Sequence, residues 1–266
     1  IPAVVRSMDN VIDVSEYPLP EQEREAKNKR RMGLGVTGVA NALEAMGLPY
    51  GSEGFCTMLD LVLATLRDEA YRASVEIAKE KGMFPLLCVD DYLKGEFIKT
   101  LPHDIREGIR EHGIRNSHLL SVAPAGTISL CADNISSGIE PVFSYAVDRK
   151  IIGEDQVART FRFDDFGVSV LGTLGKLCKD VTAEEHLRVL GVTQAYMDSA
   201  VSKTCNVDGT MPWEDFKSIY MNAWKSGCKG CTTYNSDGKR NAVLVSADTQ
   251  EGSSCSLDES GRMQCD

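Results

Sequence analysis

The chain has 266 residues, of which 42% are hydrophobic and 26% are charged, and its formal net charge is −10. This composition is typical of a soluble globular protein, and the negative charge disfavours nucleic acid and anionic membranes, because both are bound through Lys and Arg. No apolar run is long enough to cross a bilayer, and the first 30 residues lack the apolar centre of a signal peptide. We therefore expect a cytoplasmic protein with no nucleic acid or membrane partner.

Helical patterns alternate with short strand-like runs along the chain. Apolar residues spaced by three and four positions mark the helices, and Thr182 with Glu185 forms a capping box. The predicted helices cover residues 20–31, 32–46, 57–81, 103–112, 182–203 and 212–226. Runs rich in β-branched and aromatic residues predict strands at 117–123, 141–152, 158–163 and 241–245. The alternation predicts an α/β fold.

The end of the chain differs in composition from the rest. Residues 246–266 are polar and rich in small side chains, so they bury too little apolar surface to offset the entropy of the chain. We predict one folded region, residues 1–245, followed by a flexible tail, residues 246–266. The chain begins with Ile1 rather than Met, in a segment typical of the inside of a domain, so we expect a fragment or a processed subunit.

A glycine motif, Gly33-x-Gly35-x-x-Gly38, lies in the segment RRMGLGVTGVANAL. It matches the dinucleotide-binding fingerprint, which requires a buried strand before the glycines and a helix after them. The preceding residues are charged, and the helical pattern runs through the glycines. Asp60 stands at about the distance of the ribose-binding acid, but within a helical pattern. We favour a helix that packs closely through its glycines, and keep a Rossmann dehydrogenase as an alternative.

The segment from Pro124 to Ser129, PAGTIS, has the features of an anion-binding loop. It follows a predicted strand, its small side chains expose backbone N–H groups, and Thr127 and Ser129 add hydroxyl donors. No Gly-Lys-Ser/Thr follows, so the segment is not a P-loop. A plain turn is the alternative.

Six segments, taken together and in this order, resemble the C-terminal half of the large catalytic subunit of ribonucleotide reductase. The resemblance covers about residues 3–245 and is strongest to the adenosylcobalamin-dependent class. The diiron class uses a pair of adjacent tyrosines for radical transfer, and here Tyr234 has no tyrosine next to it in the sequence. The missing pair favours the cobalamin class over the diiron class. The segments are MDNVID, RRMGLGVTGVANAL, APAGTIS, NISSGIEPVF, AVSKTCNV and AWKSGCKGCTTY.

The resemblance implies the C-terminal half of a ten-stranded α/β barrel. In the family, a cysteine in an Asn-x-Cys-x-Glu motif forms a thiyl radical that acts on the ribonucleotide. This motif is absent from the sequence, so we expect no catalytic residue in this chain. We expect the chain to be the second half of a split reductase, or a fragment of a reductase. The implied partners are an N-terminal half that carries the radical cysteine and most contacts to adenosylcobalamin, the ribonucleotide substrate, and a thioredoxin-like reductant. A non-catalytic nucleotide-binding or regulatory module of the same fold is the alternative.

The resemblance also maps a substrate phosphate site onto five residues. Position 125 is often Thr or Ser in the family, so the Ala here leaves the backbone amides and Thr127 to do most of the binding. Residues 136–138 either line the nucleotide pocket or shape a turn, and Glu140 is expected to be a buried polar anchor without a catalytic role. The predicted phosphate-binding residues are Ala125, Gly126, Thr127, Ile128 and Ser129.

The nine cysteines are an odd number and do not suggest a secreted disulfide framework. Cys255 and Cys265 are candidates for a redox relay, because the family uses a mobile C-terminal pair; incidental thiols are the alternative. A zinc site formed by Cys228 and Cys231 together with the two tail cysteines would have unusual spacing between its ligands. We therefore favour a buried structural role for Cys228 and Cys231. The four histidines form no metal-binding motif, so no metal site is predicted. The expected core cysteines are Cys56, Cys88, Cys131, Cys178 and Cys205.

Overall fold

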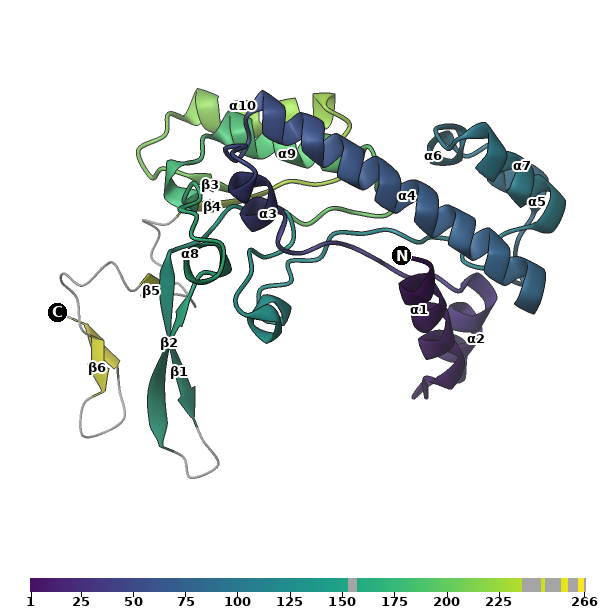
Figure 1. Cartoon of the computed structure of the whole chain (residues 1–266), viewed down its shortest axis with the longest axis horizontal. Helices are drawn as coiled ribbons and strands as arrows, with labels where there is room; N and C mark the ends of the chain where they lie inside the picture. Colours follow the sequence, from purple (N-terminus) through teal and green to yellow (C-terminus); the bar gives the residue numbers. More distant parts are fainter. Residues whose placement is uncertain (153–156, 236–244, 247–254, 258–262, 266) are drawn as a thin grey trace.

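The computed structural model describes residues 1–152, 157–235, 245–246, 255–257 and 263–265 (Figure 1). The helices are α1 (Pro2–Val14), α2 (Pro20–Lys29), α3 (Val39–Ala45), α4 (Glu53–Lys81), α5 (Val89–Tyr92), α6 (Glu96–Lys99), α7 (His103–His112), α8 (Phe166–Ser169), α9 (Ala183–Gln194) and α10 (Trp213–Lys225), with short 3₁₀ turns η1 (Ile128–Ala132) and η2 (Cys178–Asp180). The strands are β1 (Ala146–Ile152), β2 (Ala158–Asp164), β3 (Thr204–Val207), β4 (Thr232–Asn235), β5 (Val245–Ser246), β6 (Cys255–Leu257) and β7 (Met263–Cys265).

Four extended segments lie side by side and form a wall of parallel strands. Leu34 bridges Leu120, Val122 bridges Val201, and β3 pairs with β4, all in parallel. Helices α4, α9 and α10 connect successive segments and cover one face of the wall (Figure 1). This repeated strand–helix–strand order is that of an α/β barrel. Within the described residues the wall does not close, so the structure is a partial barrel and the predicted α/β class is confirmed.

The long helix α4 supplies much of the core. Ser52 caps it by accepting a hydrogen bond from the backbone of Phe55 at 3.1 Å. Leu59, Leu63 and Tyr71 along its inner face are fully buried. Each large apolar side chain buried in this way contributes about 1.5–3 kcal/mol. The same apolar cluster includes Leu119 and Leu120 of the wall, so α4 fixes the strand that leads into the 124–129 loop.

The prediction of a helix over residues 32–46 is wrong in its first half. Residues 31–38 are not helical, Leu34 among them forms a strand bridge with Leu120, and α3 begins only at Val39. Leu34 donates its N–H to Leu119 and accepts from Ser121, so pairing with the wall overrides the apolar spacing. The expected close packing through glycines does occur, but between extended segments: a Cβ on Gly35 would lie 2.5 Å from the carbonyl oxygen of Ser121.

Other predicted elements agree with the structure in kind and differ in their ends. The capping box is present, with Thr182 accepting from the Glu185 N–H. The helix that it begins ends at Gln194 rather than near 203, because Val201 joins the wall. The predicted helix over 103–112 matches α7, and the predicted strands at 141–152 and 158–163 correspond to the antiparallel hairpin of β1 and β2.

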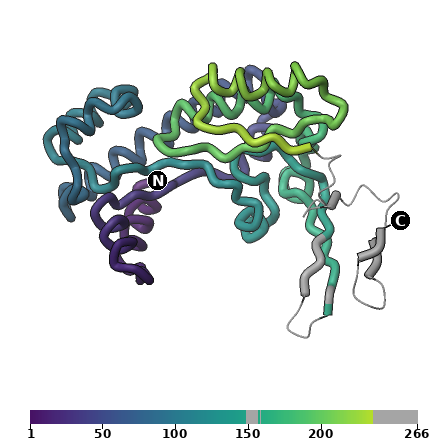
Figure 2. The backbone as a smooth tube through the Cα atoms, turned by 180° about the vertical axis from the view of Figure 1, so that it is seen from behind, coloured from purple at the N-terminus to yellow at the C-terminus, as the bar shows by residue number. Residues whose placement is uncertain are grey.

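The hairpin extends away from the helical layer, as the reverse view shows (Figure 2). β5 pairs with β1, and β6 pairs with β7 so that Cys255 stands opposite Cys265 in the backbone register. Most of the predicted strand 241–245 and of the predicted tail 246–266 lies outside the described residues, so the flexibility of the tail stays a prediction. None of the helices that the structure describes is both long and apolar enough to cross a membrane.

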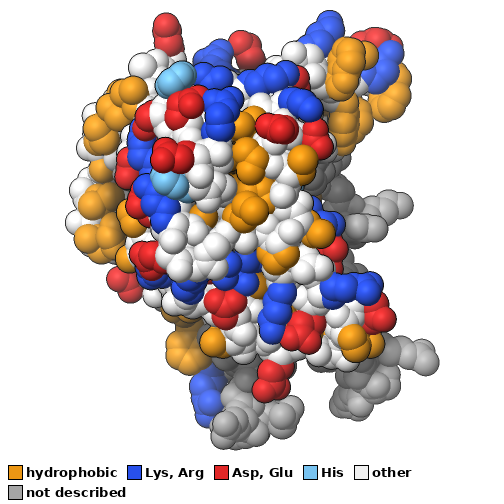
Figure 3. Space-filling model, turned by 90° about the vertical axis from the view of Figure 1, so that its right-hand side faces the viewer, with side chains coloured by type: hydrophobic (Ala, Val, Ile, Leu, Met, Phe, Trp, Pro, Cys, Tyr) orange, Lys and Arg blue, Asp and Glu red, His pale blue; other side chains and the backbone are white. Residues whose placement is uncertain are grey.

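A buried ion-pair network joins α1 to the rest of the fold. The carboxylate of Asp9 is fully buried and accepts hydrogen bonds from Arg30 at 2.8 Å, Asn116 at 3.0 Å and Arg115 at 3.2 Å. Acidic and basic side chains are interspersed on the face that Figure 3 shows. Arg6 of α1 also forms an exposed ion pair with Glu80. Exposed pairs contribute little to stability, so the buried ion pair of Asp9 matters more for the attachment of α1 than the exposed pair of Arg6.

Candidate functional site

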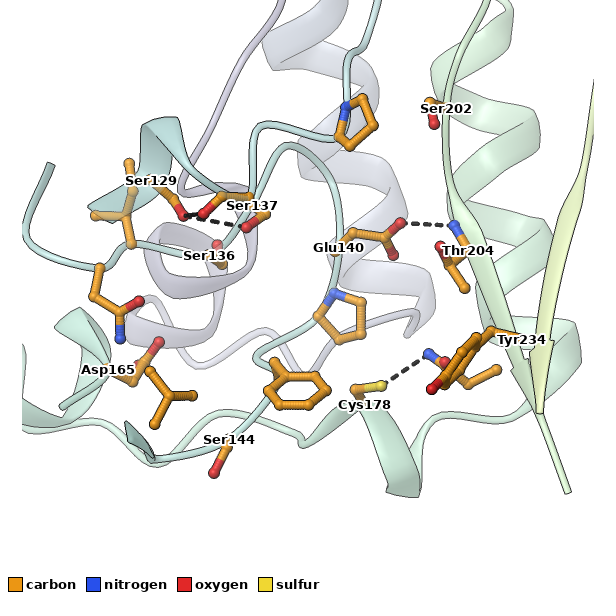
Figure 4. Close-up of a pocket in the computed structure, with 18 of the residues that line it drawn as sticks. Ser129, Ser136, Ser137, Glu140, Ser144, Asp165, Cys178, Ser202, Thr204 and Tyr234 are labelled. Carbon is orange, nitrogen blue, oxygen red and sulfur yellow. Dashed lines mark hydrogen bonds between the residues drawn. The ribbon is translucent and has the colours of Figure 1, made fainter. Parts of the chain in front are cut away.

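A pocket of about 390 Å³ lies on the inner face of the wall (Figure 4). Ser202, Thr204 and Asn206 line it, whereas Lys203 and Cys205 between them are buried on the other side. The two-residue period of a strand causes this alternation. The loop after residue 122, the start of the hairpin and β4 complete the walls. A pocket of this volume is within the range of small-molecule sites.

Two of the five predicted phosphate-binding residues, Gly126 and Ser129, line this pocket. Ser129 is buried; its hydroxyl donates to the carbonyl of Gly126 at 2.9 Å and lies 3.2 Å from the Ser137 hydroxyl. Ala125, Thr127 and Ile128 are not among the lining residues, and the Ile128 side chain is 66% exposed. The segment therefore reaches the pocket at two points, and its phosphate-binding role stays a prediction.

The backbone at Ala125 adopts a conformation that is unusual for a residue with a side chain. Its φ is +54°, in the left-handed region, which costs about 1–2 kcal/mol for a non-glycine residue. The Ser129 N–H donates to the Ala125 carbonyl at 2.9 Å, so the tight turn that follows is formed within the segment itself. Strained backbone of this kind is concentrated at binding sites.

A buried polar network holds the opposite wall of the pocket. The Ser136 N–H donates to Asn41 Oδ1 at 2.6 Å, and Asn41 Nδ2 donates to Asp165 Oδ1 at 2.9 Å. The Gly38 N–H donates to the Ser136 carbonyl at 2.7 Å. Burial raises the pKa of Asp165 despite its hydrogen bonds from Gly167 and Asn41. The end of the glycine motif thus supports the pocket without lining it.

Glu140 lines the pocket, and Figure 4 shows it beside Thr204, one of the two donors that hold it. Its Oε1 accepts the Thr204 N–H at 2.6 Å, and its Oε2 accepts from Lys203 Nζ at 2.6 Å. The Lys203 side chain is 1% exposed, whereas that of Glu140 is 23% exposed. The expectation of a polar anchor therefore fits the geometry, with the qualification that the carboxylate also faces the pocket.

Lys203 is surrounded by acceptors on the side away from the pocket. Its Nζ lies 2.9 Å from His186 Nδ1 and 3.3 Å from the Thr204 carbonyl, and 5.4 Å from the centre of the Tyr50 ring. Burial, with the nearby Lys203 charge, lowers the pKa of His186 to about 3, so the imidazole is neutral and accepts at Nδ1. Burial also lowers the pKa of Lys203, while the charge of Glu140 opposes this shift.

Cys178 is a pocket residue, so its assignment to the core is wrong. Its Sγ accepts a hydrogen bond from Asn206 Nδ2 at 2.8 Å, and burial, followed by the charge of Glu140, raises the thiol pKa to about 11. Cys88 and Cys131 are exposed, which contradicts their assignment to the core, whereas Cys56 and Cys205 are buried as expected. Cys88 and Cys131 are exposed because they lie in segments that run over the surface, and the apolar neighbours of a cysteine in the sequence do not show this.

The sequence did not indicate three further residues that line the pocket: Asn206, Tyr234 and Phe143. One signal was available: Ser202, Thr204 and Asn206 are polar at a period of two, which places them on one face of a strand. Nothing local to Tyr234 or Phe143 indicates the pocket. Within the described part of the chain, no group of three or more His, Cys, Asp or Glu side chains is arranged to hold a metal ion.

These features define part of an α/β barrel with a polar pocket on its inner face. The chain belongs to the ribonucleotide reductase family, since residues 1–165 and 173–234 match the family model of the ribonucleotide reductase barrel domain. The family match and the contact of Gly35 with Ser121 leave no support for a Rossmann dinucleotide site.

Several characterised proteins resemble the chain along most of its length. It is 33% identical to the vitamin B12-dependent ribonucleoside-diphosphate reductase of Mycobacterium tuberculosis (strain CDC 1551 / Oshkosh), over 91% of this chain and 36% of that protein. Identity is 29% to the protein of the same name from Thermoplasma acidophilum, over 90% of this chain and 33% of that protein. The chain is 27% identical to ribonucleoside-diphosphate reductase 1 subunit alpha of Escherichia coli (strain K12), over 82% of this chain and 31% of that protein. The chain thus spans about a third of the length of these relatives.

Proposed function

We propose that this chain provides the substrate-binding inner face of a ribonucleotide reductase that makes deoxyribonucleotides. The observation that carries the proposal is the 390 Å³ pocket on the inner face of the wall, which Gly126, Ser129 and Ser137 line at one side. A mononucleotide is of suitable size for this pocket. The family membership and the names of the relatives support the same reaction.

The substrate phosphates bind at the loop of residues 125–129. The hydroxyls of Ser129 and Ser137 lie 3.2 Å apart on one side of the pocket, and both are able to donate to a phosphate oxygen in place of their present partners. Thr127 belongs to the same loop and is exposed outside the pocket lining, where its hydroxyl is free to donate to a phosphate group that extends out of the pocket. The phosphates bind away from Glu140, because two like charges in a shared pocket repel each other.

A second part of the reductase completes the barrel. The wall of parallel strands is open within the described residues, and the relatives are about three times longer than the matched segment. We propose that an N-terminal half carries the radical cysteine, either on a separate chain or on the same one. In the cytoplasm, a thioredoxin-like protein then supplies electrons through Cys255 and Cys265, whose backbones pair in β6 and β7.

Adenosylcobalamin is the cofactor that the names of two relatives suggest. When bound, it supplies the radical that starts the reaction. The pocket on the inner face of the wall does not fit it, because that pocket is of mononucleotide size and the corrin ring is much larger. We therefore assign the cofactor mainly to the N-terminal half and derive no step of this chain's residues through it.

Titration of the assembled reductase with a ribonucleoside diphosphate and with inorganic pyrophosphate tests the phosphate site. Ser129→Ala and Thr127→Ala should each weaken both ligands about three- to tenfold, the effect of one lost hydrogen bond. Thr65→Ala is the control, because Thr65 is exposed and its hydroxyl donates to the Leu61 carbonyl within the same helix, α4. Unchanged affinity in both variants would refute the phosphate assignment. Nucleotide binding without any turnover would favour a non-catalytic module.

A further inference from the structure

Both tryptophans of the chain lie exposed on α10, outside the pocket. Trp213 is 65% exposed, Trp224 is 72% exposed, and Tyr220 between them is 43% exposed. The Phe216 ring stacks on that of Trp213 with centres 5.7 Å apart, and its centre lies 5.6 Å from that of the Tyr220 ring. These four residues follow one another at spacings of three and four, so they form one line along the helix, here called the aromatic stripe.

The aromatic stripe lies on the side of α10 that faces away from α9. Ala223 and Ile219 bury the inner side of the helix in the core. In an α/β barrel the helices form an outer ring, in which each helix has a neighbour on both sides. The stripe is therefore where the next helix of the ring belongs. The groove toward α9 is lined by a different and mostly small, polar set of α10 residues: Asp215, Ser218, Ile219, Asn222 and Ser226.

The free edge of the wall lies beside the same side of α10. The Tyr220 hydroxyl is 2.8 Å from the Thr233 hydroxyl of β4. Among the residues that the structure describes, β4 pairs with β3 alone, so its other edge has no strand. In the reverse view α10 and β4 lie nearest the viewer (Figure 2). The sheet and the layer of helices therefore end at the same place.

The chemistry of the stripe calls for an apolar partner. Exposed apolar patches mark interaction sites, and tryptophan and tyrosine are enriched at the centres of protein interfaces. The cation beside the stripe is Lys217, whose Nζ lies 5.9 Å from the centre of the Trp213 ring. Its charge is balanced by Glu214 at 2.7 Å within the helix. An occupant of the stripe thus needs apolar side chains rather than an acidic group.

On the basis of the proposed function, in which a second part of the reductase completes the barrel, we propose that the aromatic stripe binds the apolar face of a helix from that N-terminal half. This helix lies along α10, while a strand of the same half pairs with the free edge of β4. The relatives extend far beyond the matched segment, so they contain chain for such a helix. The tail, residues 246–266, is poorly suited to cover the stripe, because Leu257 and Met263 are its only large apolar side chains.

Hydroxyl-radical footprinting of the assembled wild-type reductase, read at each residue by mass spectrometry, tests this docking surface. Relative to free tryptophan, Trp213 and Trp224 should be oxidised at least about fivefold more slowly, because side chains that are 65% and 72% exposed here become part of an interface core. Leu86, which is 59% exposed after α4, is the internal control and should stay reactive. Oxidation of both tryptophans in proportion to their present exposure overturns the proposal without any variant.

Variants then use one tryptophan to report on the other. Trp224→Glu introduces a charge into the apolar contact, so oxidation of Trp213 in the assembled reductase should rise at least about threefold. The fold of this chain should tolerate the change, because the Trp224 side chain is largely exposed. Trp224→Phe keeps the contact apolar, and Leu86→Glu places the same charge elsewhere, so both should leave Trp213 protected. Protection of Trp213 that survives Trp224→Glu contradicts a single contact surface.

A photo-cross-linker at position 224 identifies the occupant. A bond to a peptide of the N-terminal half supports the proposal, whereas a bond to residues 246–266 or to a second copy of this chain overturns it. Ribonucleotide turnover by the same reductase separates the two proposals. An active reductase with an uncovered stripe contradicts the docking surface alone, and an inactive reductase with a covered stripe contradicts the proposed function alone.

Discussion

The side chain of Asn41 and the backbone of Ser136 hydrogen-bond to each other across 95 positions of sequence. The Ser136 N–H donates to Asn41 Oδ1 at 2.6 Å, and the Asn41 N–H donates to the Ser136 hydroxyl at 3.3 Å. Both residues are buried. The pair joins the segment that contains the glycine motif to the wall of the pocket, so packing in the barrel directly sets the shape of the site.

Asn41→Ala should destabilise the chain by about 2–4 kcal/mol, because it leaves the Ser136 N–H and one side of Asp165 without a partner. Urea denaturation measures the loss. Asn222→Ala, on the exposed face of α10, is the matched control and should change stability by less than about 0.5 kcal/mol. Equal effects of the two substitutions would show that the buried network does not stabilise the pocket wall.

Gly35→Ala should prevent normal packing of the wall. The added Cβ would lie 2.5 Å from the Ser121 carbonyl oxygen, which is backbone and cannot move aside cheaply. We expect a loss of about 3 kcal/mol or more, visible as a large fall in Tm. Gly230→Ala is the control, since its Cβ meets nothing within 4 Å. A Gly35→Ala protein as stable as wild type would contradict the close approach of these segments.

Acid should weaken the attachment of α1 through Asp9. Burial tends to raise the pKa of Asp9, but the hydrogen bond and charge of Arg30, with Asn116 and Arg115, hold it below the usual value. A depressed folded-state pKa gives stability that is complete above the unfolded pKa, near 3.9, and is lost as the pH falls through the folded value.

Asp9→Asn should therefore cost about 3–5 kcal/mol at pH 7, because Arg30 is left without its buried partner. The difference from wild type should begin to shrink below about pH 4, where the carboxyl of the unfolded chain becomes protonated while the folded carboxyl is still held ionised, and it should go on shrinking as the pH falls toward the lowered folded-state pKa. Denaturant unfolding at pH 7 and at pH 3 checks both statements. A difference that stays constant with pH would show that the charge of Asp9 is not what stabilises the network.

Ala125→Gly should stabilise the turn before Ser129. The left-handed φ of +54° is unfavourable for Ala and free of strain for Gly, so we expect a gain of up to about 1 kcal/mol. Ala125→Val should lose at least as much, since a β-branched residue is poorly tolerated there. Thermal unfolding of both variants provides the measurement. The opposite order of Tm would mean that the turn adopts another conformation in solution.

The relay role of the tail predicts a selective loss of activity. In the assembled reductase, Cys255→Ser with Cys265→Ser should reduce turnover with a thioredoxin-like protein by at least about tenfold. Turnover with a small dithiol should be preserved, because a small dithiol can deliver electrons to the active site without the relay. Cys88→Ser, which removes another exposed thiol, is the control and should change neither rate. Full activity of the double variant with the protein reductant would leave the two thiols incidental.

Local patterns in the sequence determined most of the helices. Thr182 and Glu185 fix the start of α9 within four residues, and the apolar residues of α4 repeat on one face over many turns. The order of six short segments pointed to the family. These signals are readable because capping and helical periodicity depend on near neighbours along the chain.

Only the tertiary structure decided how the pocket is built. Residues 31–38 have helical apolar spacing, yet they are not helical, because the hydrogen bonds of Leu34 to the strand at 119–122 outweigh a weak local preference. Cys178 has the local context of a core residue, yet it lines the pocket. Glu140 gains its partners from Lys203 and Thr204, more than 60 positions away. Such contacts depend on which segments the fold brings together, and no local pattern encodes that.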